Sequence, residues 1–311
     1  MREILFFQKV FKEKMWGSDR LKTLFDMNIP SDHTGECWVI SGHPSGQTEV
    51  LNGTFAGWTL QDIWGKRRDI FGHIEGEEFP LLVKIIDACD DLSIQVHPDE
   101  HYAMSKPKDV FPKTECWYIL DCEDGAEIIL GHKAQTREDF EQMVRQGKWE
   151  ELLQKIPVKK GDFVYVPSGT VHALTTGILV LEIQQSSDTT YRLYDYDRLE
   201  NGVPRELHIE ESLEVVRVPH SIENQMIQVE TYPHATKSIL TETPYFSVYK
   251  FDIDGQVSLH QDKPFMIMGV VEGAGSVDGY PVKKGDHFIL PCDYGDFVLE
   301  GTMSLIASTK E

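Results

Sequence analysis

Three things are scarce in this 311-residue sequence, and each scarcity narrows what the protein can be. It contains no run of about 18 apolar residues, so we expect no helix that spans a membrane. Lys and Arg number 30 against 51 Asp and Glu, and the formal net charge of −21 argues against nucleic acid and anionic membrane surfaces as partners. The apolar segment near the N-terminus is too short for a secretory signal peptide.

Cysteine is the third scarce component. The five cysteines are an odd number and are scattered along the chain, at Cys37, Cys89, Cys116, Cys122 and Cys292. No two of them form a CxxC pair, which argues against a structural zinc site built on thiolates. We interpret them as reduced thiols and expect a cytoplasmic protein.

A protein of strongly negative charge can still bind a small anion where Lys and Arg residues gather locally. The basic residues nearest to the polar motifs of the sequence are Lys84, Lys113, Arg192, Arg198 and Arg205.

Short apolar segments separated by turn residues dominate the sequence, which predicts a mainly β fold. Clear strand candidates, rich in β-branched and aliphatic residues, are residues 79–86, 114–120 and 179–185. Residues 136–156 differ, because Thr136 followed by Asp139 fits a capping box and apolar residues then recur at helical spacing. We expect a small helical insertion there, packed on the β domain.

One segment occurs twice. Residues 158–167 and 282–291 both begin with Val-Lys-Lys-Gly-Asp and both end in proline, which indicates a duplicated β unit. The second copy lacks the polar cluster of the first, since an aspartate stands where the first copy has His172. We therefore predict a catalytic domain over residues 1–230 and a second, degenerate domain without a metal site over residues 231–311.

Polar and apolar residues alternate in the segment that follows the first strand candidate. Ser93, Gln95 and His97 lie on one face of the predicted strand, because strand side chains change sides at every residue. A carboxamide and an imidazole then point in the same direction. Taken alone, the alternation is typical of a surface strand whose polar residues face water.

Glu115 and His172 turn this strand into a candidate metal site together with Gln95 and His97. Imidazole nitrogen, carboxylate oxygen and amide oxygen are suitable ligands for a divalent first-row ion. Two histidines and one carboxylate match catalytic sites, which keep positions open for substrate. Each residue singly has a plainer interpretation, such as a core histidine with satisfied hydrogen bonds.

Residues 161–172, with the spacing Gly-x5-Pro-x-Gly-x2-His, resemble the second motif of the cupin superfamily. Gln95-x-His97 followed by Glu115 resembles the first motif, with glutamine in place of its leading histidine. The resemblance implies two cupin-type (jelly-roll) β-barrel domains and a metal in the first. Because cupins catalyse many reactions, it implies no particular chemistry.

A closer resemblance is to type I mannose-6-phosphate isomerase (phosphomannose isomerase), carried by residues 79–84, 92–99, 113–115 and 191–192, with Trp16-Gly17, residues 36–38 and Asn52-Gly53 in addition. The length resembles the short bacterial form. The resemblance implies a zinc enzyme, with one divalent ion per chain, that interconverts mannose 6-phosphate and fructose 6-phosphate. Position by position, it implies Gln95, His97, Glu115 and His172 as metal ligands and Arg192 as the catalytic arginine.

The reaction that this implies is aldose–ketose isomerisation through a cis-enediol(ate), in which negative charge develops on the sugar oxygens. Arg192 can stabilise that charge or steady the phosphate; the alternative is a surface arginine paired with Asp188 or Asp195. Lys113 is one candidate for the base, with its pKa lowered by burial and by the nearby cation, and the sequence does not choose among the candidates. A hydroxide on the cation and another carboxylate remain alternatives.

For the phosphate we predict contacts from Ser93, with Lys84 or Arg198 supplying charge. A buried pairing role is an equal alternative for Lys84. The expected partner is a small sugar phosphate, and the sequence makes no prediction of oligomeric state. Two other functions fit the same motifs: a cupin dioxygenase, which Gln95 and the surrounding basic residues disfavour, and a non-catalytic sugar-phosphate-binding module.

Overall fold

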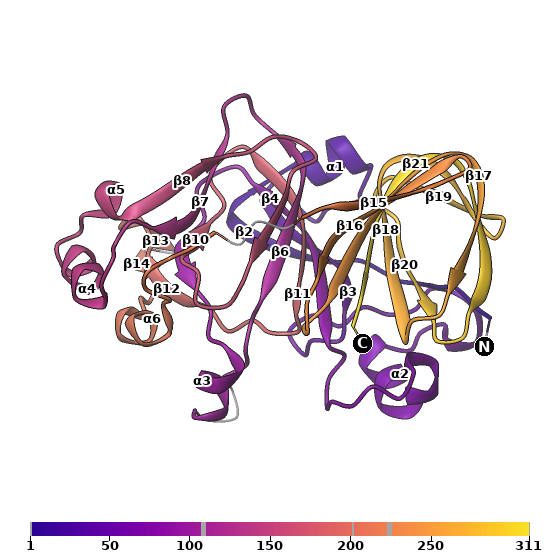
Figure 1. The fold of residues 1–311 in the computed structure, drawn as a ribbon, viewed down its shortest axis with the longest axis horizontal. Helices are drawn as coiled ribbons and strands as arrows, with labels where there is room; N and C mark the ends of the chain where they lie inside the picture. The colour runs from indigo at the N-terminus through magenta and orange to yellow at the C-terminus, as the bar shows by residue number, and fades with distance from the viewer. Residues whose placement is uncertain (1, 107–109, 201, 223–225, 311) are drawn as a thin grey trace.

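The computed structural model describes residues 2–106, 110–200, 202–222 and 226–310. The fold is mainly β, as the sequence predicted, and consists of two β units that lie side by side (Figure 1). No helix in the described ranges is long and apolar enough to cross a membrane.

Two sheets build the first unit. The six-stranded sheet has the order β2 (Val10–Ser18), β3 (Thr34–Ser41), β4 (Leu81–Ala88), β11 (Ile178–Gln185), β6 (Glu115–Cys122) and β9 (Phe163–Val166). The five-stranded sheet has the order β12 (Tyr191–Tyr194), β5 (Ile94–Val96), β10 (His172–Ala173), β7 (Glu127–His132) and β8 (Leu153–Pro157). Their inner faces pack on a shared apolar cluster that includes Ile86, Trp117, Ile128 and Val180.

A single eight-stranded sheet builds the second unit, in the order β1 (Leu5–Phe6), β20 (His287–Pro291), β18 (Phe265–Val277), β21 (Gly295–Thr309), β17 (Ser247–Gln261), β16 (Ala235–Glu242) and β15 (Gln228–Tyr232), with β19 (Tyr280–Lys283) paired to β18. This sheet encloses a core of its own. It also takes a strand from the start of the chain, since β1 pairs with β20.

The strand β4 shows why the two units pack together. All eight of its residues are buried, because its two faces meet different cores. Ile86 points to the interior of the first unit, whereas Val83 and Ile85 join a cluster that also contains Phe265 and Ile306 of the second unit. A near-continuous apolar strand is what burial on both faces requires.

The repeated segment forms the same turn in both units. Gly161 and Gly285 have φ of +92° and +91°, a backbone region that side chains other than glycine rarely adopt. In each turn the next residue, Asp162 or Asp286, accepts a hydrogen bond of 2.9 Å from a lysine backbone N–H. The repetition in sequence therefore corresponds to a repetition in local structure.

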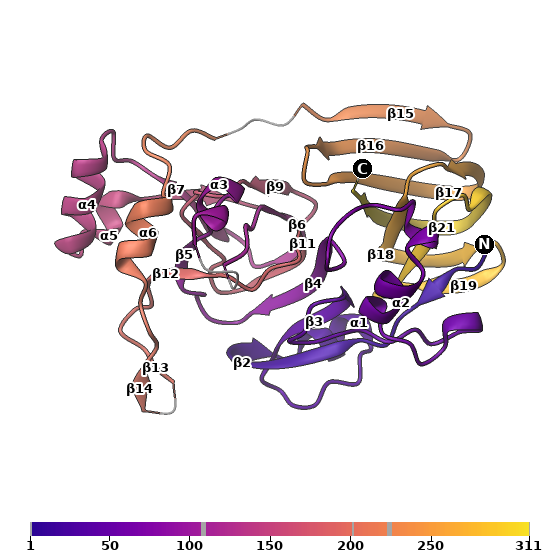
Figure 2. The same cartoon turned by 90° about the horizontal axis from the view of Figure 1, so that it is seen from below.

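The remaining elements are short: α1 (Arg20–Phe25), α2 (Leu60–Lys66), α3 (Glu100–Met104), α4 (Arg137–Arg145), α5 (Trp149–Leu152), α6 (Ile209–Val215), the 3-10 helices η1 (Gly53–Phe55) and η2 (Arg68–Phe71), and the hairpin of β13 (Leu199–Glu200) and β14 (Val203–Pro204). The helices α4, α5 and α6 lie at the outer side of the five-stranded sheet, and the β13–β14 hairpin projects away from the body of the molecule (Figure 2).

The predicted helical insertion is confirmed at its start and wrong at its end. The Thr136 hydroxyl accepts a hydrogen bond of 3.1 Å from the Asp139 N–H, as the capping box predicted. Residues 153–157 are not helical; they form β8, which pairs with β7. The exposed edge of β7 offers a hydrogen-bond ladder, and this tertiary partner outweighs the helical spacing of the local sequence.

Candidate active site

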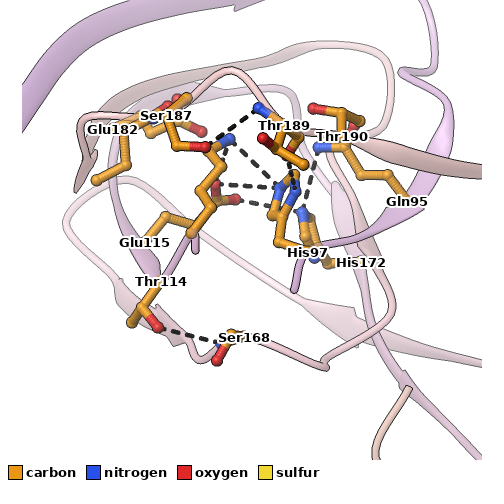
Figure 3. A network of polar contacts seen from close by, with 12 residues as sticks. Gln95, His97, Thr114, Glu115, Ser168, His172, Glu182, Ser187, Thr189 and Thr190 are labelled. Carbon is orange, nitrogen blue, oxygen red and sulfur yellow. Dashed lines mark hydrogen bonds and ion pairs between the residues drawn. The ribbon is translucent and has the colours of Figure 1, made fainter. Parts of the chain in front are cut away.

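The structure brings His97, Glu115 and His172 together inside the first unit, with their ligand atoms all within 4.8 Å of one another (Figure 3). His97 directly follows β5, Glu115 is the first residue of β6, and His172 is the first residue of β10. All three side chains are at most 1% exposed. Three segments that are distant in sequence therefore place their polar residues at one buried point.

Backbone carbonyls orient both histidine rings. The Nδ1 atom of His97 lies 2.9 Å from the Thr189 carbonyl oxygen, and Nδ1 of His172 lies 2.9 Å from that of Thr170. A carbonyl oxygen only accepts hydrogen bonds, so in each ring Nδ1 carries the proton and Nε2 presents its lone pair. Such outer contacts to His are usual at metal sites.

Both Nε2 atoms face Glu115, and Lys113 Nζ also lies 3.3 Å from that of His97. Glu115 Oε1 lies 3.2 Å from Nε2 of His172, and Oε2 lies 3.5 Å from Nε2 of His97. The amide end of Gln95 approaches the same place, with Nε2 at 3.2 Å from Nε2 of His172. Because the two ends of an amide exchange by a half-turn of its last torsion, the oxygen of Gln95 can take this position.

The donor set fits a divalent metal ion. Both oxygens of Glu115 are buried; the Lys113 ammonium lies 2.7 Å from Oε2, and each oxygen also faces an imidazole Nε2. Carboxylate oxygens that face imidazole lone pairs repel them, and a cation held between the carboxylate and the two Nε2 atoms removes that repulsion.

The electrostatics of the three residues agree with this interpretation. Burial, and then the Lys113 charge, lower the pKa of His97 to about 3, so the ring is neutral near pH 7. Burial alone would raise the pKa of Glu115, but Lys113 and His172 hold it well below its usual value. A neutral imidazole and an ionised carboxylate are the forms that bind metals.

The pKa of Lys113 is raised, whereas the sequence analysis expected it to be lowered. Burial lowers its pKa, as expected, but the carboxylates of Glu115, Glu182 and Glu36 outweigh burial and raise the pKa overall. In the field of the protein's own residues, Lys113 is therefore an ammonium group. The sequence reasoning considered the cation and did not anticipate three carboxylates around one lysine.

A cavity of about 140 Å³ lies beside these residues and includes Gln95 and Lys113 in its lining. Five basic side chains face it, from Lys14, Lys84, Lys113, Arg192 and Arg205, against two acidic ones from Glu36 and Glu182. This excess of positive charge occurs in a protein whose formal net charge is −21. The cavity is therefore suited to an anionic ligand.

The predicted phosphate contacts are not all in the same place. Ser93 and Lys84 line the cavity, and Lys84 pairs with Glu182 at 3.1 Å, which is the buried pairing weighed as its alternative. Arg192 also lines the cavity. Arg198 does not belong to the lining, because its guanidinium donates to the Asp91 carbonyl at 2.5 Å and to the Asp195 carboxylate at 2.7 Å.

Sequence reasoning missed Glu182. Its Oε1 accepts a hydrogen bond of 3.2 Å from the Trp117 indole, while its buried Oε2 pairs with the Lys84 ammonium at 3.1 Å. Glu182 could have been noticed in the sequence, because it is the only charged residue in the mostly apolar strand β11. Burying a charge costs free energy unless the charge is paired, so such a residue often has a function.

Comparison with known proteins agrees with the resemblance noted in the sequence. A family model described as phosphomannose isomerase type I, catalytic domain, matches residues 4–124, and one described as mannose-6-phosphate isomerase, cupin domain, matches residues 236–310. The chain is 50% identical to the mannose-6-phosphate isomerase ManA of Bacillus subtilis, over 98% of each chain.

Solved structures of mannose 6-phosphate isomerases also resemble this chain. A crystal structure of mannose 6-phosphate isomerase from Bacillus subtilis superposes with a TM-score of 0.96 at 48% identity, covering 98% of this chain and 99% of that one. A zinc-bound mannose 6-phosphate isomerase shares the fold, with a TM-score of 0.78 at 16% identity over 99% of both chains. From its full-length similarity at 50% identity, the chain belongs to the type I phosphomannose isomerase family.

Proposed function

We propose that this chain is a metal-dependent isomerase that interconverts mannose 6-phosphate and fructose 6-phosphate by proton transfer through a cis-enediol(ate). The observation that carries the proposal is the buried His97, Glu115 and His172 cluster, which lies beside a cavity whose charged lining residues are mostly basic. The name of the Bacillus subtilis relative, 50% identical over its full length, supports the substrate assignment.

We propose zinc as the ion, held by Gln95, His97, Glu115 and His172. The zinc-bound form of a structural neighbour supports this choice. When bound, the ion supplies Lewis-acid stabilisation of negative charge on the reacting sugar oxygens.

Side chains of the protein stabilise the remaining charge and transfer the proton. Arg192 stabilises developing negative charge on the sugar, since its guanidinium stays protonated and it lines the cavity. Lys113, as the ammonium that its carboxylate neighbours favour, donates a hydrogen bond to a sugar oxygen; it accepts the proton from C2 only if it first loses its own. Glu182, whose buried Oε2 pairs with Lys84 and which lines the cavity, is the carboxylate that can serve as base instead.

Ser93 and Lys84 are the proposed substrate contacts that line the cavity. Ser93 offers a hydroxyl, and Lys84 offers a cation that shares Glu182. We do not extend the proposal to Arg198, which points to Asp90 and Asp91.

We also propose that residues 1–230 act as the catalytic unit and residues 231–311 as a second unit without a metal site. Among the described residues, the only group of three or more metal-ligating side chains is His97, Glu115 and His172. In the second unit, the nearest equivalent is the exposed pair of His260 and Asp296, 2.6 Å apart.

A coupled assay for fructose 6-phosphate, run on the zinc-loaded protein with mannose 6-phosphate, tests the proposal. Activity should disappear with a chelator and return with zinc. Oxygen consumption without sugar conversion would identify a dioxygenase, and binding of the sugar phosphate without turnover would identify a binding module. Folded, zinc-loaded protein that forms no product rejects the isomerase.

A further inference from the structure

The positive charge of the active-site cavity is concentrated in two arginines. The three lysines of the lining each have a glutamate partner, at 3.0 Å for Lys14 and Glu36, 3.1 Å for Lys84 and Glu182, and 2.7 Å for Lys113 and Glu115. Arg192 has no carboxylate within 4.0 Å among the described residues, and Arg205 shares one carboxylate with Arg198. An anion that enters the cavity therefore finds a guanidinium without a carboxylate partner at Arg192 and a second guanidinium, paired only with Asp195, at Arg205.

Arg192 has hydrogen-bonding capacity left over. Its Nη1 donates to the Glu206 carbonyl at 2.7 Å, while its Nε is buried and has no partner in the described part of the chain. Burial and the charge of Arg205 lower the pKa of Arg192. The two guanidinium groups repel each other, and an anion bound between them relieves that repulsion.

Arg205 is held rigidly by Asp195. Its Nε and Nη2 donate to the two oxygens of the Asp195 carboxylate, with Nε at 2.7 Å, which is the bidentate geometry that fixes a guanidinium plane. Asp195 is only 4% exposed, so this pair is shielded from water. Among the described residues no acceptor takes the protons of Arg205 Nη1, which leaves that nitrogen free for a ligand.

Arg198 provides an internal contrast. It donates to the same Asp195 carboxylate, at 2.7 Å, and its side chain is about as shielded as that of Arg205, 15% against 16% exposed. Its other nitrogen turns to Asp91, outside the lining of the cavity. One carboxylate thus holds two arginines, of which only Arg205 faces the site.

We infer that Arg205 is a specificity-determining contact to the substrate's phosphate, which it binds together with Arg192, and that Asp195 is the residue that positions Arg205. The inference rests on the proposed function, because it takes the phosphate of a sugar phosphate as the anion. Each guanidinium group is planar and offers several N–H donors for hydrogen bonds to phosphate oxygens. A lysine cannot reproduce this geometry.

Steady-state kinetics with mannose 6-phosphate and calorimetric titration with inorganic phosphate test the inference on the zinc-loaded, full-length protein. Arg205→Ala should raise KM about 10- to 100-fold, leave kcat within about threefold, and weaken phosphate binding by a similar factor. Arg205→Lys should fall between Arg205→Ala and the wild type. Asp195→Asn should change KM in the same direction by a smaller factor, whereas the control Arg198→Ala should stay within about twofold.

Two results would overturn the inference: Arg205→Ala with unchanged KM and phosphate affinity, or Arg198→Ala with an equal effect. Either would make Arg205 a structural residue. If Arg205→Ala does not fold, as circular dichroism would show, Arg205→Gln carries the same comparison. Failure of the proposed function is distinguishable, since the wild type would not convert mannose 6-phosphate while the phosphate titrations would still separate Arg205 from Arg198.

Discussion

Gln95 and Arg192 are direct partners across neighbouring strands. On its other side, Gln95 is the partner of His172, so one row across the five-stranded sheet carries an arginine, an amide and an imidazole. Two of the proposed metal ligands, Gln95 and His172, and the proposed charge-stabilising arginine are therefore fixed relative to one another by paired strands. A site built on paired strands keeps its geometry better than one built on loops.

His172→Ala should remove both the metal and the activity. The substitution deletes one of the two imidazole donors from a buried site that offers no replacement, so bound zinc should fall from one ion per chain to near zero and kcat/KM by at least about 1,000-fold. Metal analysis by mass spectrometry beside the coupled assay measures both. His260→Ala, in the second unit, is the control and should keep its zinc; full metal occupancy in His172→Ala would show that the site is elsewhere.

Glu182→Gln should lower the rate of the chemical step without lowering the zinc content of the protein. The amide keeps the size of the side chain and can still accept from Trp117, but it cannot accept a proton. If Glu182 is the base, kcat falls by about 100- to 10,000-fold while zinc content and KM change little. Lys113→Met is the matched comparison, and a loss of kcat only in Lys113→Met would assign the base to the lysine.

Asp87→Ala should strongly destabilise the first unit. Asp87 is fully buried and holds Arg20, whose Nε lies 2.6 Å from Oδ1 and whose other nitrogens donate to the carbonyls of Gly177 and Ile178. Removing the carboxylate leaves a charge without its partner, which costs about 3–5 kcal/mol. Urea unfolding measures the change. Glu150→Ala, at the exposed pair with Lys155, should change the stability by less than about 1 kcal/mol.

His287 should make the protein sensitive to acid. Burial and the charge of Lys9 lower the pKa of its ring to about 3, from 6.5 in the unfolded chain. Between these values the unfolded state binds the extra proton, so stability is intact above about pH 6.5 and falls with decreasing pH by up to about 1.4 kcal/mol per unit.

His287→Gln tests this assignment. Glutamine can still donate to the Gly285 carbonyl, which His287 Nδ1 contacts at 3.1 Å, but it does not titrate. Thermal melts from pH 7 to pH 4.5 should show a flatter decline of Tm in the variant than in the wild type. Parallel curves would show that other groups cause the acid sensitivity.

Local signals predicted the fold class because they report directly on backbone geometry. The Gly-Asp turns of the repeated segment require a positive φ at glycine, and both copies have it. The helical insertion was predicted at its capping residue, Thr136, where the signal is local. Its end was wrong because β8 exists only through pairing with β7, and the local sequence of residues 153–157 does not reveal that pairing.

The sequence by itself determined which side chains can bind a metal, since Gln95 and His97 share a strand face and Glu115 and His172 are the donor types that such an ion needs. Only the tertiary structure decided which basic residues line the cavity. Arg198 and Arg205 look equivalent in sequence, but the carbonyl of Asp91, more than a hundred residues earlier in the chain, turns Arg198 away from the cavity. Long charged side chains follow the partners that folding brings to them, and those partners are not local.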